Sequence, residues 1–256
     1  MTSATEAAAE PIGSNSQGGR LRIPRMAAAP TREFLAAIEA GPDARAEAQR
    51  HVLNVVLALG LFVLLLPVMA LIAIAIKLTS PGPVIYKQTR VGLDRRFGET
   101  RGTDPRRLVD YGGRLFTMYK FRTMTADPSA NLQIWAKPND ARVTKLGRVL
   151  RSLRLDELPQ LVNVIRGDMN IVGPRPEQPN IFLTLRDSVN RYQERQRVLP
   201  GITGWAQINH HYDRCVDDVR RKVEYDLEYI KRSSIAEDIR ILLQTLPVMV
   251  FKKGAL

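Results

Sequence analysis

The strongest hydrophobic signal in the sequence is a run of 26 residues, His51 to Ile76, that contains no Asp, Glu, Lys or Arg. About 20 apolar residues are enough for a helix to cross the hydrocarbon core of a bilayer. A helix in the core of a soluble protein seldom combines this length with apolar residues on all sides. The run therefore predicts a membrane helix over residues 48–78.

Pro67 lies in the second half of this run and removes one helical hydrogen bond, so it is expected to bend or break the helix. Basic residues flank both ends, with Arg45 and Arg50 before the run and Lys77, Lys87 and Arg90 after it. Positive flanks favour the cytoplasmic side. A re-entrant hairpin with both ends in the cytoplasm satisfies both flanks. A straight transmembrane span satisfies only one, and the sequence leaves that alternative open.

Short strands and amphipathic helices follow the membrane segment. The residue pattern predicts strands at Val84–Tyr86 and Leu115–Phe121. A last helix begins with a capping box of Ser234 and Glu237 and meets Pro247, which bends or ends it. Helical periodicity predicts three further segments: Thr144–Ile165, Phe182–Val198 and 215–231. The expected fold class is α+β and helix-rich, with amphipathic helices at the membrane interface.

The chain divides into three segments on this basis. Residues 1–47 form a disordered or weakly helical N-terminal segment, and residues 1–30 are rich in Ala, Gly, Ser, Thr and Pro. Residues 48–78 form the membrane helix. Residues 79–256 form a catalytic domain, within which the polar segment 94–113 is predicted to be a surface loop with no assigned role.

Composition and charge limit the kinds of ligand that the protein is expected to bind. The chain has 256 residues, a net charge of +12 and a single cysteine, so an internal disulfide and a cysteine-rich zinc site are excluded. Acids and bases balance in residues 1–50, and the whole positive excess lies downstream. A basic domain attracts nucleic acid, anionic lipid or phosphate substrates, and charge alone does not choose among them.

Asp156 and Glu157 are the sharpest candidates for chemistry. They are expected to open a helix in which Pro159 occupies the first turn. The N-terminus of a helix favours ionised carboxylates and bound phosphate. Asp156 could attack phosphorus while Glu157 holds a divalent cation, with nearby arginines neutralising phosphate oxygens: Arg148, Arg151, Arg154 and Arg166. The motif alone favours the simpler alternative, in which Asp156 only caps the helix.

Three other segments supply candidate binding residues. Arg175 lies between Pro174 and Pro176, which fix the backbone around a guanidinium suited to phosphate or uracil oxygens. Lys120 and Arg122 alternate along a predicted strand and would share one face. Gln207 follows a tight turn and a Trp that is predicted to be buried, and could contact a ligand. Structural or solvent-exposed roles are the alternatives for each segment. The sequence contains no phosphate-binding Walker loop and no zinc or nucleic-acid signature.

Taken together, several short strings resemble one family, the bacterial sugar transferases, which are monotopic polyprenol-phosphate phosphoglycosyltransferases. The resemblance extends over about residues 48 to 251. The matching strings, in chain order, are Ser80-Pro-Gly-Pro-Val84, Tyr86-Lys-Gln-Thr-Arg-Val-Gly92, Tyr119-Lys-Phe-Arg-Thr-Met124, Leu155-Asp-Glu-Leu-Pro-Gln-Leu161, Gly167-Asp-Met169, Val172-Gly-Pro-Arg-Pro176 and Pro200-Gly-Ile-Thr-Gly-Trp-Ala-Gln207.

The resemblance implies transfer of a sugar 1-phosphate from a UDP-sugar to undecaprenyl phosphate, with release of UMP, as the priming step of exopolysaccharide or glycan synthesis. It implies a membrane helix broken near Pro67 and a catalytic domain on the cytoplasmic face of the bacterial inner membrane. Asp156 would form a covalent phosphosugar intermediate, and the Asp156–Glu157 pair, Glu157 above all, would bind Mg²⁺ or Mn²⁺. Substrate contacts would come from Lys120, Arg122, Arg151 and Arg175, with Gln207 as a further contact.

Two residues depart from the family pattern. Asn54 replaces an Asp and alters any pairing with Arg50, and Leu199 replaces an Arg before the Pro200 turn. Three alternatives stay open: a membrane-tethered binder of nucleic acid or anionic lipid, a non-catalytic scaffold, and the same enzyme with a spanning helix. The enzyme would have no nucleic-acid partner. The sequence does not reveal the sugar or whether the chain forms a homo-oligomer.

Overall fold

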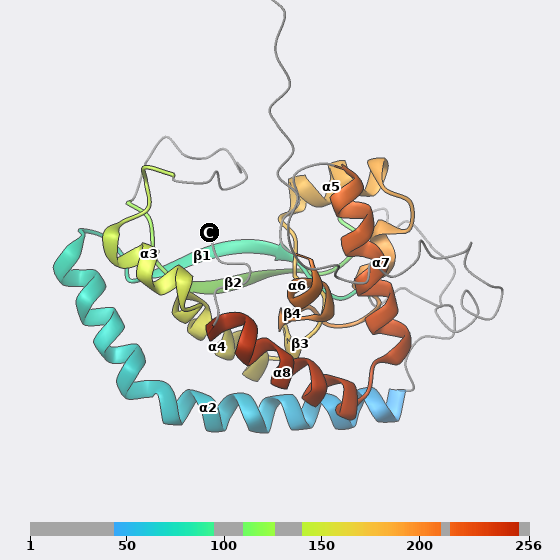
Figure 1. Ribbon diagram of the computed structural model, residues 1–256, viewed down its shortest axis with the longest axis horizontal. Helices are drawn as coiled ribbons and strands as arrows, with labels where there is room; N and C mark the ends of the chain where they lie inside the picture. Colours follow the sequence, from blue (N-terminus) through green and yellow to red (C-terminus); the bar gives the residue numbers. More distant parts are fainter. Residues whose placement is uncertain (1–43, 95–109, 126–139, 211–215, 251–256) are drawn as a thin grey trace, which may run out of the picture.

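The computed structural model describes residues 44–94, 110–125, 140–210 and 216–250. Figure 1 shows a long helix, a two-stranded ribbon, a group of short helices and strands, and two final helices. This helix-rich α+β fold confirms the predicted class. The predictions for residues 1–43, for most of the 94–113 segment and for the last six residues fall outside the described residues.

Helix α2, Ala44–Thr79, covers the predicted membrane segment and begins a few residues before it. Figure 1 shows α2 running along one edge of the molecule and turning in its second half. Pro67 lies inside this half of α2 and cannot donate a helical hydrogen bond, which accounts for the turn. Pro67 therefore bends a continuous helix and does not interrupt it.

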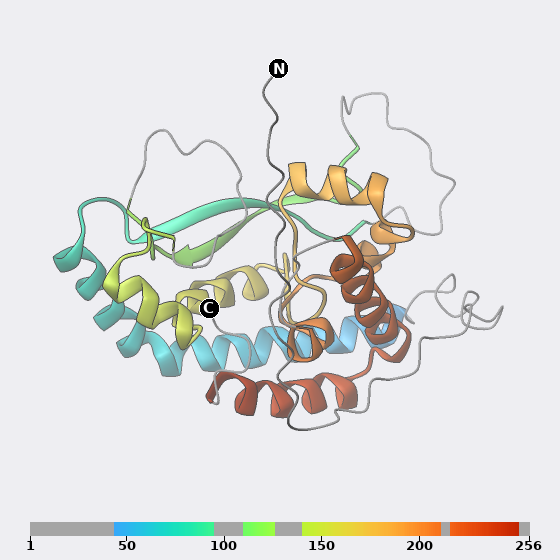
Figure 2. The ribbon, with the colours of Figure 1, turned by 45° about the horizontal axis from the view of Figure 1, so that its top comes forward.

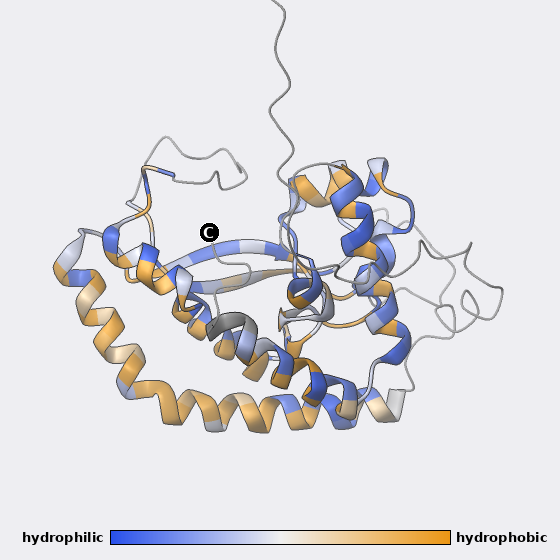
Figure 3. Ribbon diagram, in the orientation of Figure 1, coloured by the Kyte–Doolittle hydropathy of each residue, from blue (hydrophilic) through white to orange (hydrophobic). Residues whose placement is uncertain are grey.

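Figure 3 shows α2 as a long hydrophobic stretch. Most of its apolar side chains are uncovered by the rest of the protein. Leu64 is 71% exposed and Leu71 is 67% exposed, whereas Ala58 and Ile76 are buried. Within the described part of the chain, α2 is the one helix long and apolar enough to cross a membrane. An apolar surface of this extent is unfavourable in water. The helix is therefore compatible with a monotopic membrane protein.

Strands β1, Ile85–Val91, and β2, Leu115–Phe121, pair in antiparallel fashion and confirm the two predicted strands. Helix α4, Leu161–Ile165, lies between this ribbon and α2 in both Figures 1 and 2. Asn163 of α4 joins it to β2, because its Nδ2 donates to Thr117 O at 2.7 Å and its Oδ1 accepts from Tyr119 N at 3.1 Å.

The segment predicted as helical over Thr144–Ile165 consists of three elements. Helix α3, Lys145–Ser152, is followed by the 3₁₀-helix η1, Leu155–Gln160, and then by α4. Arg154, with φ +57°, separates α3 from η1. A residue in the left-handed region cannot continue a right-handed helix, so the chain changes direction just before Asp156. Hydrophobic periodicity did not reveal this division, because apolar positions continue through it.

Strand β3, Asn170–Val172, pairs in parallel with β4, Gly201–Thr203. The single helix predicted over Phe182–Val198 is wrong. Helix α5, Pro179–Ser188, and the 3₁₀-helix η2, Tyr192–Arg197, occupy this region, and Arg191, with φ +62°, lies directly before η2. The short helix α6, Trp205–Asn209, follows β4, and its Trp205 is half-buried where full burial was predicted.

Helix α7, Val216–Arg232, confirms the amphipathic helix predicted over 215–231, with Val219 and Val223 on its buried face. Helix α8, Ile235–Val250, begins at the predicted cap, where Glu237 N donates to Ser234 Oγ at 3.2 Å. Pro247 lies inside α8 and does not end it. The apolar residues along the uncovered side of α8 are Ile235, Ile239, Leu243 and Leu246.

A buried ion pair joins the first turns of α2 to α8. Arg50 is 2% exposed and donates to both carboxylate oxygens of Asp238, at 3.0 and 3.1 Å, and to the Tyr229 hydroxyl at 2.6 Å. Asn54, the residue that departs from the family pattern, donates to Arg50 O at 2.8 Å and accepts from Ile171 N at 2.8 Å. The partner of Arg50 is thus Asp238, and Asn54 connects the membrane helix to β3.

A second buried network surrounds Glu177, which follows β3 in the chain. Lys222 Nζ of α7 lies 2.7 Å from Glu177 Oε1, and Arg90 of β1 and Arg195 of η2 each lie 3.9 Å from its carboxylate. Arg195 in turn pairs with Asp226 of α7 at 2.6 Å. Burial alone would raise the pKa of Glu177, but Lys222, Arg195 and Arg90 outweigh it and lower the pKa to about 2.

This low pKa makes the stability of the protein depend on acidity. The unfolded chain takes up the proton of Glu177 near its ordinary pKa of 4.5, and the folded chain only near pH 2. The stabilisation, on the order of 3 kcal/mol, is therefore complete above about pH 5 and is lost as the pH falls towards 2. Glu177→Gln should lower the melting temperature at pH 7, and its difference from wild type should shrink in acid. Melting temperatures of both proteins in detergent solution between pH 7 and pH 3 test this expectation, and a difference that stays constant over this range would contradict it. Asp187→Asn, at an exposed position, is the control.

Candidate active site

Asp156 and Glu157 lie in the first turn of η1, as the sequence predicted, although the element is a short 3₁₀-helix. The residue before η1, Arg154, has no side-chain capping bond, and neither carboxylate caps η1. Both side chains belong to residues that are at most 7% exposed. Burial of two adjacent acids is unfavourable unless nearby charges compensate for it, so the surroundings of the pair indicate its role.

Glu157 is compensated by three cationic side chains from three different parts of the chain. Its Oε1 lies 2.8 Å from Arg175 Nη2, 3.0 Å from Lys120 Nζ and 3.7 Å from Arg154 Nη1. Burial would raise the pKa of Glu157, but these cations outweigh it and hold the pKa well below its usual range. Glu157 is therefore ionised throughout the physiological pH range.

Asp156 lies beside this cluster but is not tied to it. Within the described residues no donor forms a hydrogen bond or an ion pair with its carboxylate. Burial raises its pKa and Glu157 raises it further, while Lys120 and Arg175 act in the opposite direction. Its oxygens are thus available to an electrophile or a cation, in a setting where positive charge is close by.

The structure brings two of the predicted binding residues together at this pair, Lys120 and Arg175. Arg151 lies nearby on α3, where its Nε donates to Thr123 Oγ1 at 3.0 Å. Burial lowers the pKa of Lys120, and the Glu157 carboxylate opposes this effect. The ion pair with Glu157 keeps the Lys120 ammonium directed at the site.

Arg122 and Gln207 are held elsewhere. Strand β2 ends at Phe121, and the Arg122 guanidinium donates to Pro81 O at 2.6 Å and to Ser80 O at 2.8 Å. It also lies against Gly82, whose φ of +115° and missing Cβ let the exit turn of α2 close around it. Gln207 of α6 donates to Ile202 O of β4 at 3.1 Å. Alternation along a strand could not show that Arg122 lies just beyond the last paired residue.

Two cationic residues of the site were not among the predicted substrate contacts. Arg154 was expected only as one of four arginines near the pair, and Arg90 only as a basic flank of the membrane segment and as part of a matching string. Arg90 is buried next to Arg175 and Glu157, and desolvation lowers its pKa to about 10 although Glu177 opposes this. Its position in a string that also contains Gln88, which accepts a hydrogen bond from Arg90 at 2.6 Å, was the only available signal.

The protein groups at this site suit a metal ion whose coordination shell is completed by substrate and water. The described residues contain no group of three or more His, Cys, Asp or Glu that could hold a metal ion. The protein can offer the two carboxylates of Asp156 and Glu157, and of these Asp156 has uncommitted oxygens. Mg²⁺ typically takes one or two carboxylates and completes its shell with phosphate oxygens and water. The pair therefore fits a magnesium ion bound together with a diphosphate.

Known proteins similar to this chain include three sugar phosphotransferases. A UDP-N-acetylgalactosamine-undecaprenyl-phosphate N-acetylgalactosaminephosphotransferase of Aeromonas hydrophila is 40% identical over 204 residues, 80% of this chain and 43% of that protein. UDP-glucose:undecaprenyl-phosphate glucose-1-phosphate transferases of Escherichia coli and Caulobacter vibrioides are 41% and 35% identical, over 75% and 93% of this chain. The matched regions cover 38% of the E. coli protein and 84% of the Caulobacter protein.

The chain thus spans less than half the length of the first two relatives, and most of the length of the third. The model of the bacterial sugar transferase family matches residues 45–252, which include α2, the Glu157 cluster and α8. Because this match covers most of the chain and agrees with relatives at 35–41% identity, the chain belongs to the bacterial sugar transferase family.

Proposed function

We propose that this protein transfers a sugar 1-phosphate from a UDP-sugar to undecaprenyl phosphate and releases UMP. The observation that carries the proposal is the free Asp156 carboxylate beside a Glu157 that is neutralised by Lys120, Arg175 and Arg154. The named substrates of the relatives, UDP-sugars and undecaprenyl phosphate, supply the donor and acceptor classes. This transfer would be the priming step of exopolysaccharide or glycan synthesis.

The first step joins the donor to the protein. An Asp156 oxygen attacks the phosphorus that bears the sugar, the bond from that phosphorus to the bridging oxygen breaks, and UMP leaves with the electron pair. Lys120 and Arg175 lie where they can neutralise the phosphate oxygens as charge builds up. In the second step an oxygen of undecaprenyl phosphate attacks the same phosphorus, which releases Asp156 and forms the polyprenyl diphosphate sugar.

Magnesium would be held by Glu157 and Asp156 together with the diphosphate of the donor, and it would supply charge neutralisation for the phosphate oxygens. The ionised state of Glu157 supports this role, since its pKa is far below its usual range. Lys120 and Arg175 keep the Glu157 carboxylate in place through its Oε1. They thereby orient the pair before any ligand binds.

The membrane arrangement that we propose is a re-entrant α2 with the catalytic domain facing the cytoplasm at the inner membrane. Both halves of α2 pack on the same domain: Arg50 pairs with Asp238, and Ile76 lies in one apolar cluster with Phe121 and Leu150. A straight transmembrane helix would have its ends on opposite faces of the bilayer, so only one end could contact the domain. The uncovered apolar residues of α8 support a helix at the interface with membrane lipid.

Removal of the nucleophile tests the chemistry. Asp156→Asn should lower UMP release from a panel of UDP-sugars, measured with undecaprenyl phosphate and Mg²⁺, by at least about 10³-fold. Wild-type protein incubated with donor alone should carry a phosphosugar on Asp156, detectable by mass spectrometry. The exposed Asp187→Asn is the matched control and should keep full turnover. Turnover retained in Asp156→Asn would remove Asp156 as the nucleophile, and turnover without a divalent cation would remove the metal ion from the mechanism. Absence of UMP release in the wild-type protein would favour a binding protein.

The cation cluster gives a second expectation. Lys120→Gln removes one positive charge from the Asp156–Glu157 pair, and kcat should fall by roughly 10- to 100-fold because phosphate charge is less well neutralised. Arg232→Gln, on an exposed side chain of α7, should leave kcat unchanged. Initial rates at saturating donor and acceptor measure both variants, and equal rates for Lys120→Gln and wild type would remove Lys120 from the mechanism.

Topology can be read by cysteine labelling. In a Cys215→Ser background, Ala46→Cys at the start of α2 and Arg220→Cys on α7 occupy exposed positions. A membrane-impermeant maleimide added to intact spheroplasts should label neither, and it should label both after permeabilisation. Labelling of Ala46→Cys alone from outside would show that α2 spans the membrane.

A further inference from the structure

Arg175 lies in a loop, residues 174–177, whose backbone carbonyl groups accept hydrogen bonds from other parts of the protein. At its two ends, Pro174 O accepts from Gly201 N at 3.0 Å and Glu177 O accepts from Val91 N at 2.9 Å. Pro174 and Pro176 have no N–H of their own, so the loop cannot join a regular hydrogen-bond ladder. Each carbonyl that it buries must therefore find a donor on another element.

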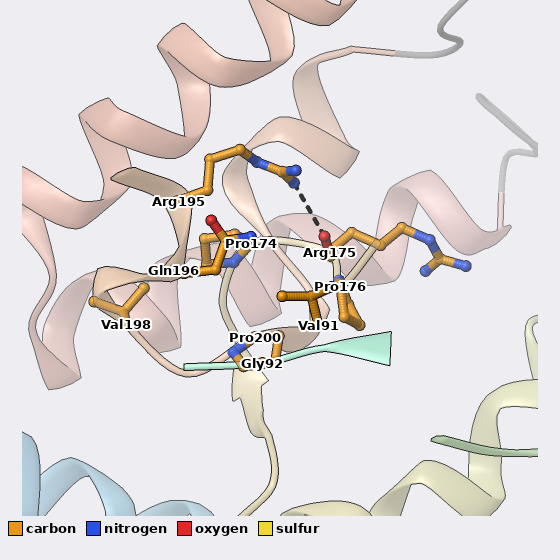
Figure 4. A pocket seen from close by; sticks show the side chains of 9 residues that line it. All are labelled: Val91, Gly92, Pro174, Arg175, Pro176, Arg195, Gln196, Val198 and Pro200. Atoms are coloured by element: carbon orange, nitrogen blue, oxygen red, sulfur yellow. Dashed lines mark hydrogen bonds between the residues drawn. The ribbon is translucent and has the colours of Figure 1, made fainter. Parts of the chain in front are cut away.

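The two middle carbonyl oxygens accept from guanidinium groups. Arg195 Nη2 donates to Arg175 O at 3.0 Å, and Arg90 Nη1 donates to Pro176 O at 2.9 Å. Figure 4 shows Arg175, Pro176 and Arg195 around a hollow beside the loop, with the Arg195 guanidinium directed at the Arg175 carbonyl. The side chain of Arg175 points away from this hollow, and its Nη2 reaches Glu157. The backbone and the side chain of Arg175 are thus held by different partners.

Arg195 is itself held rigidly. Its side chain is 1% exposed, its Nε donates to Asp226 Oδ2 at 2.6 Å, and its Nη1 donates to the Tyr192 hydroxyl at 2.9 Å. Its guanidinium carbon also lies 5.0 Å from the centre of the Tyr192 ring. A guanidinium presents its donors in a fixed planar fork. The position of Arg175 O is therefore tied to α7 and η2 through a single buried group.

We propose that Arg195 is a positioning residue, which holds the backbone of Arg175 so that the Arg175 guanidinium meets Glu157. Displacement of this carbonyl by a fraction of an ångström would move the guanidinium relative to Glu157 and to the phosphate that it neutralises. Arg195 does not touch the reacting atoms in this arrangement. Its effect on turnover passes through Arg175, and in this respect the inference rests on the proposed function.

A double-mutant cycle between Arg195 and Arg175 tests the inference. Arg195→Lys keeps the charge but loses the fork, and should lower kcat about 10-fold while the KM for undecaprenyl phosphate stays unchanged. Arg175→Ala should lower kcat further. In the Arg175→Ala background, Arg195→Lys should change kcat by less than about 2-fold, because the group that it positions is gone. Independent effects that multiply would overturn the proposal.

Two additional variants keep the test decisive. Asp226→Asn removes the charged partner of Arg195 and should lower kcat in the wild-type background. In the Arg175→Ala background it should change kcat by less than about 2-fold. This variant serves as the test where Arg195→Lys folds poorly. Arg220→Lys, exposed on α7, should leave kcat unchanged in both backgrounds.

Melting temperatures of the wild type, Arg195→Lys, Arg175→Ala and the double variant report the contact without any substrate. Arg175→Ala keeps the backbone carbonyl that Arg195 contacts, so Arg195→Lys should lower the melting temperature by a similar amount in both backgrounds. A melting temperature that Arg195→Lys leaves unchanged would contradict the contact. Absence of UMP release in the wild-type protein would refute the proposed function, while these melting temperatures would still judge the contact between Arg195 and Arg175.

Discussion

The site depends on the burial of two adjacent acids, because a low-dielectric setting does not tolerate uncompensated negative charge. Glu157 meets this constraint with cations from the β2 strand, the β3–α5 loop and the turn before η1. Besides the neighbouring Arg154, the segments that carry Lys120 and Arg175 must therefore come together before the pair can be buried. Asp156 then remains free of direct partners, which is the state that a nucleophile towards phosphorus requires.

The same principle organises the interior behind the site. Glu177 and Asp226 are buried against Lys222, Arg195 and Arg90, and this network also donates hydrogen bonds to the loop that carries Arg175. A buried ion network contributes little more to folding stability than apolar side chains of the same volume would. The loss of one member is destabilising, however, because its partner remains charged. Such a network favours one geometry of the loop over others, which suits the role proposed for the Arg175 guanidinium beside Glu157.

The membrane helix is connected to this interior at its beginning and in its second half. Arg50 and Asn54 join α2 to α8 and to β3, and Ile76 packs with Phe121 near the exit turn. An apolar helix that serves only as an anchor needs no buried polar contacts with the domain it carries. The contacts seen here fix the domain relative to the apolar helix. In the proposed arrangement they would hold it at the bilayer surface, where a lipid-linked phosphate would meet a soluble nucleotide-sugar.

The sequence by itself determined the membrane helix, the β1–β2 strands, the amphipathic α7 and the position of Asp156 and Glu157 at the start of a helix, because these follow from local periodicity and proline placement. Its motifs also indicated the family. Tertiary structure decided the rest. The turn of Arg122 away from the Glu157 cluster and the pairing of Arg195 with Arg175 O each depend on residues from distant segments. No local pattern encodes these contacts, since a buried charge finds its partner only when the chain has folded.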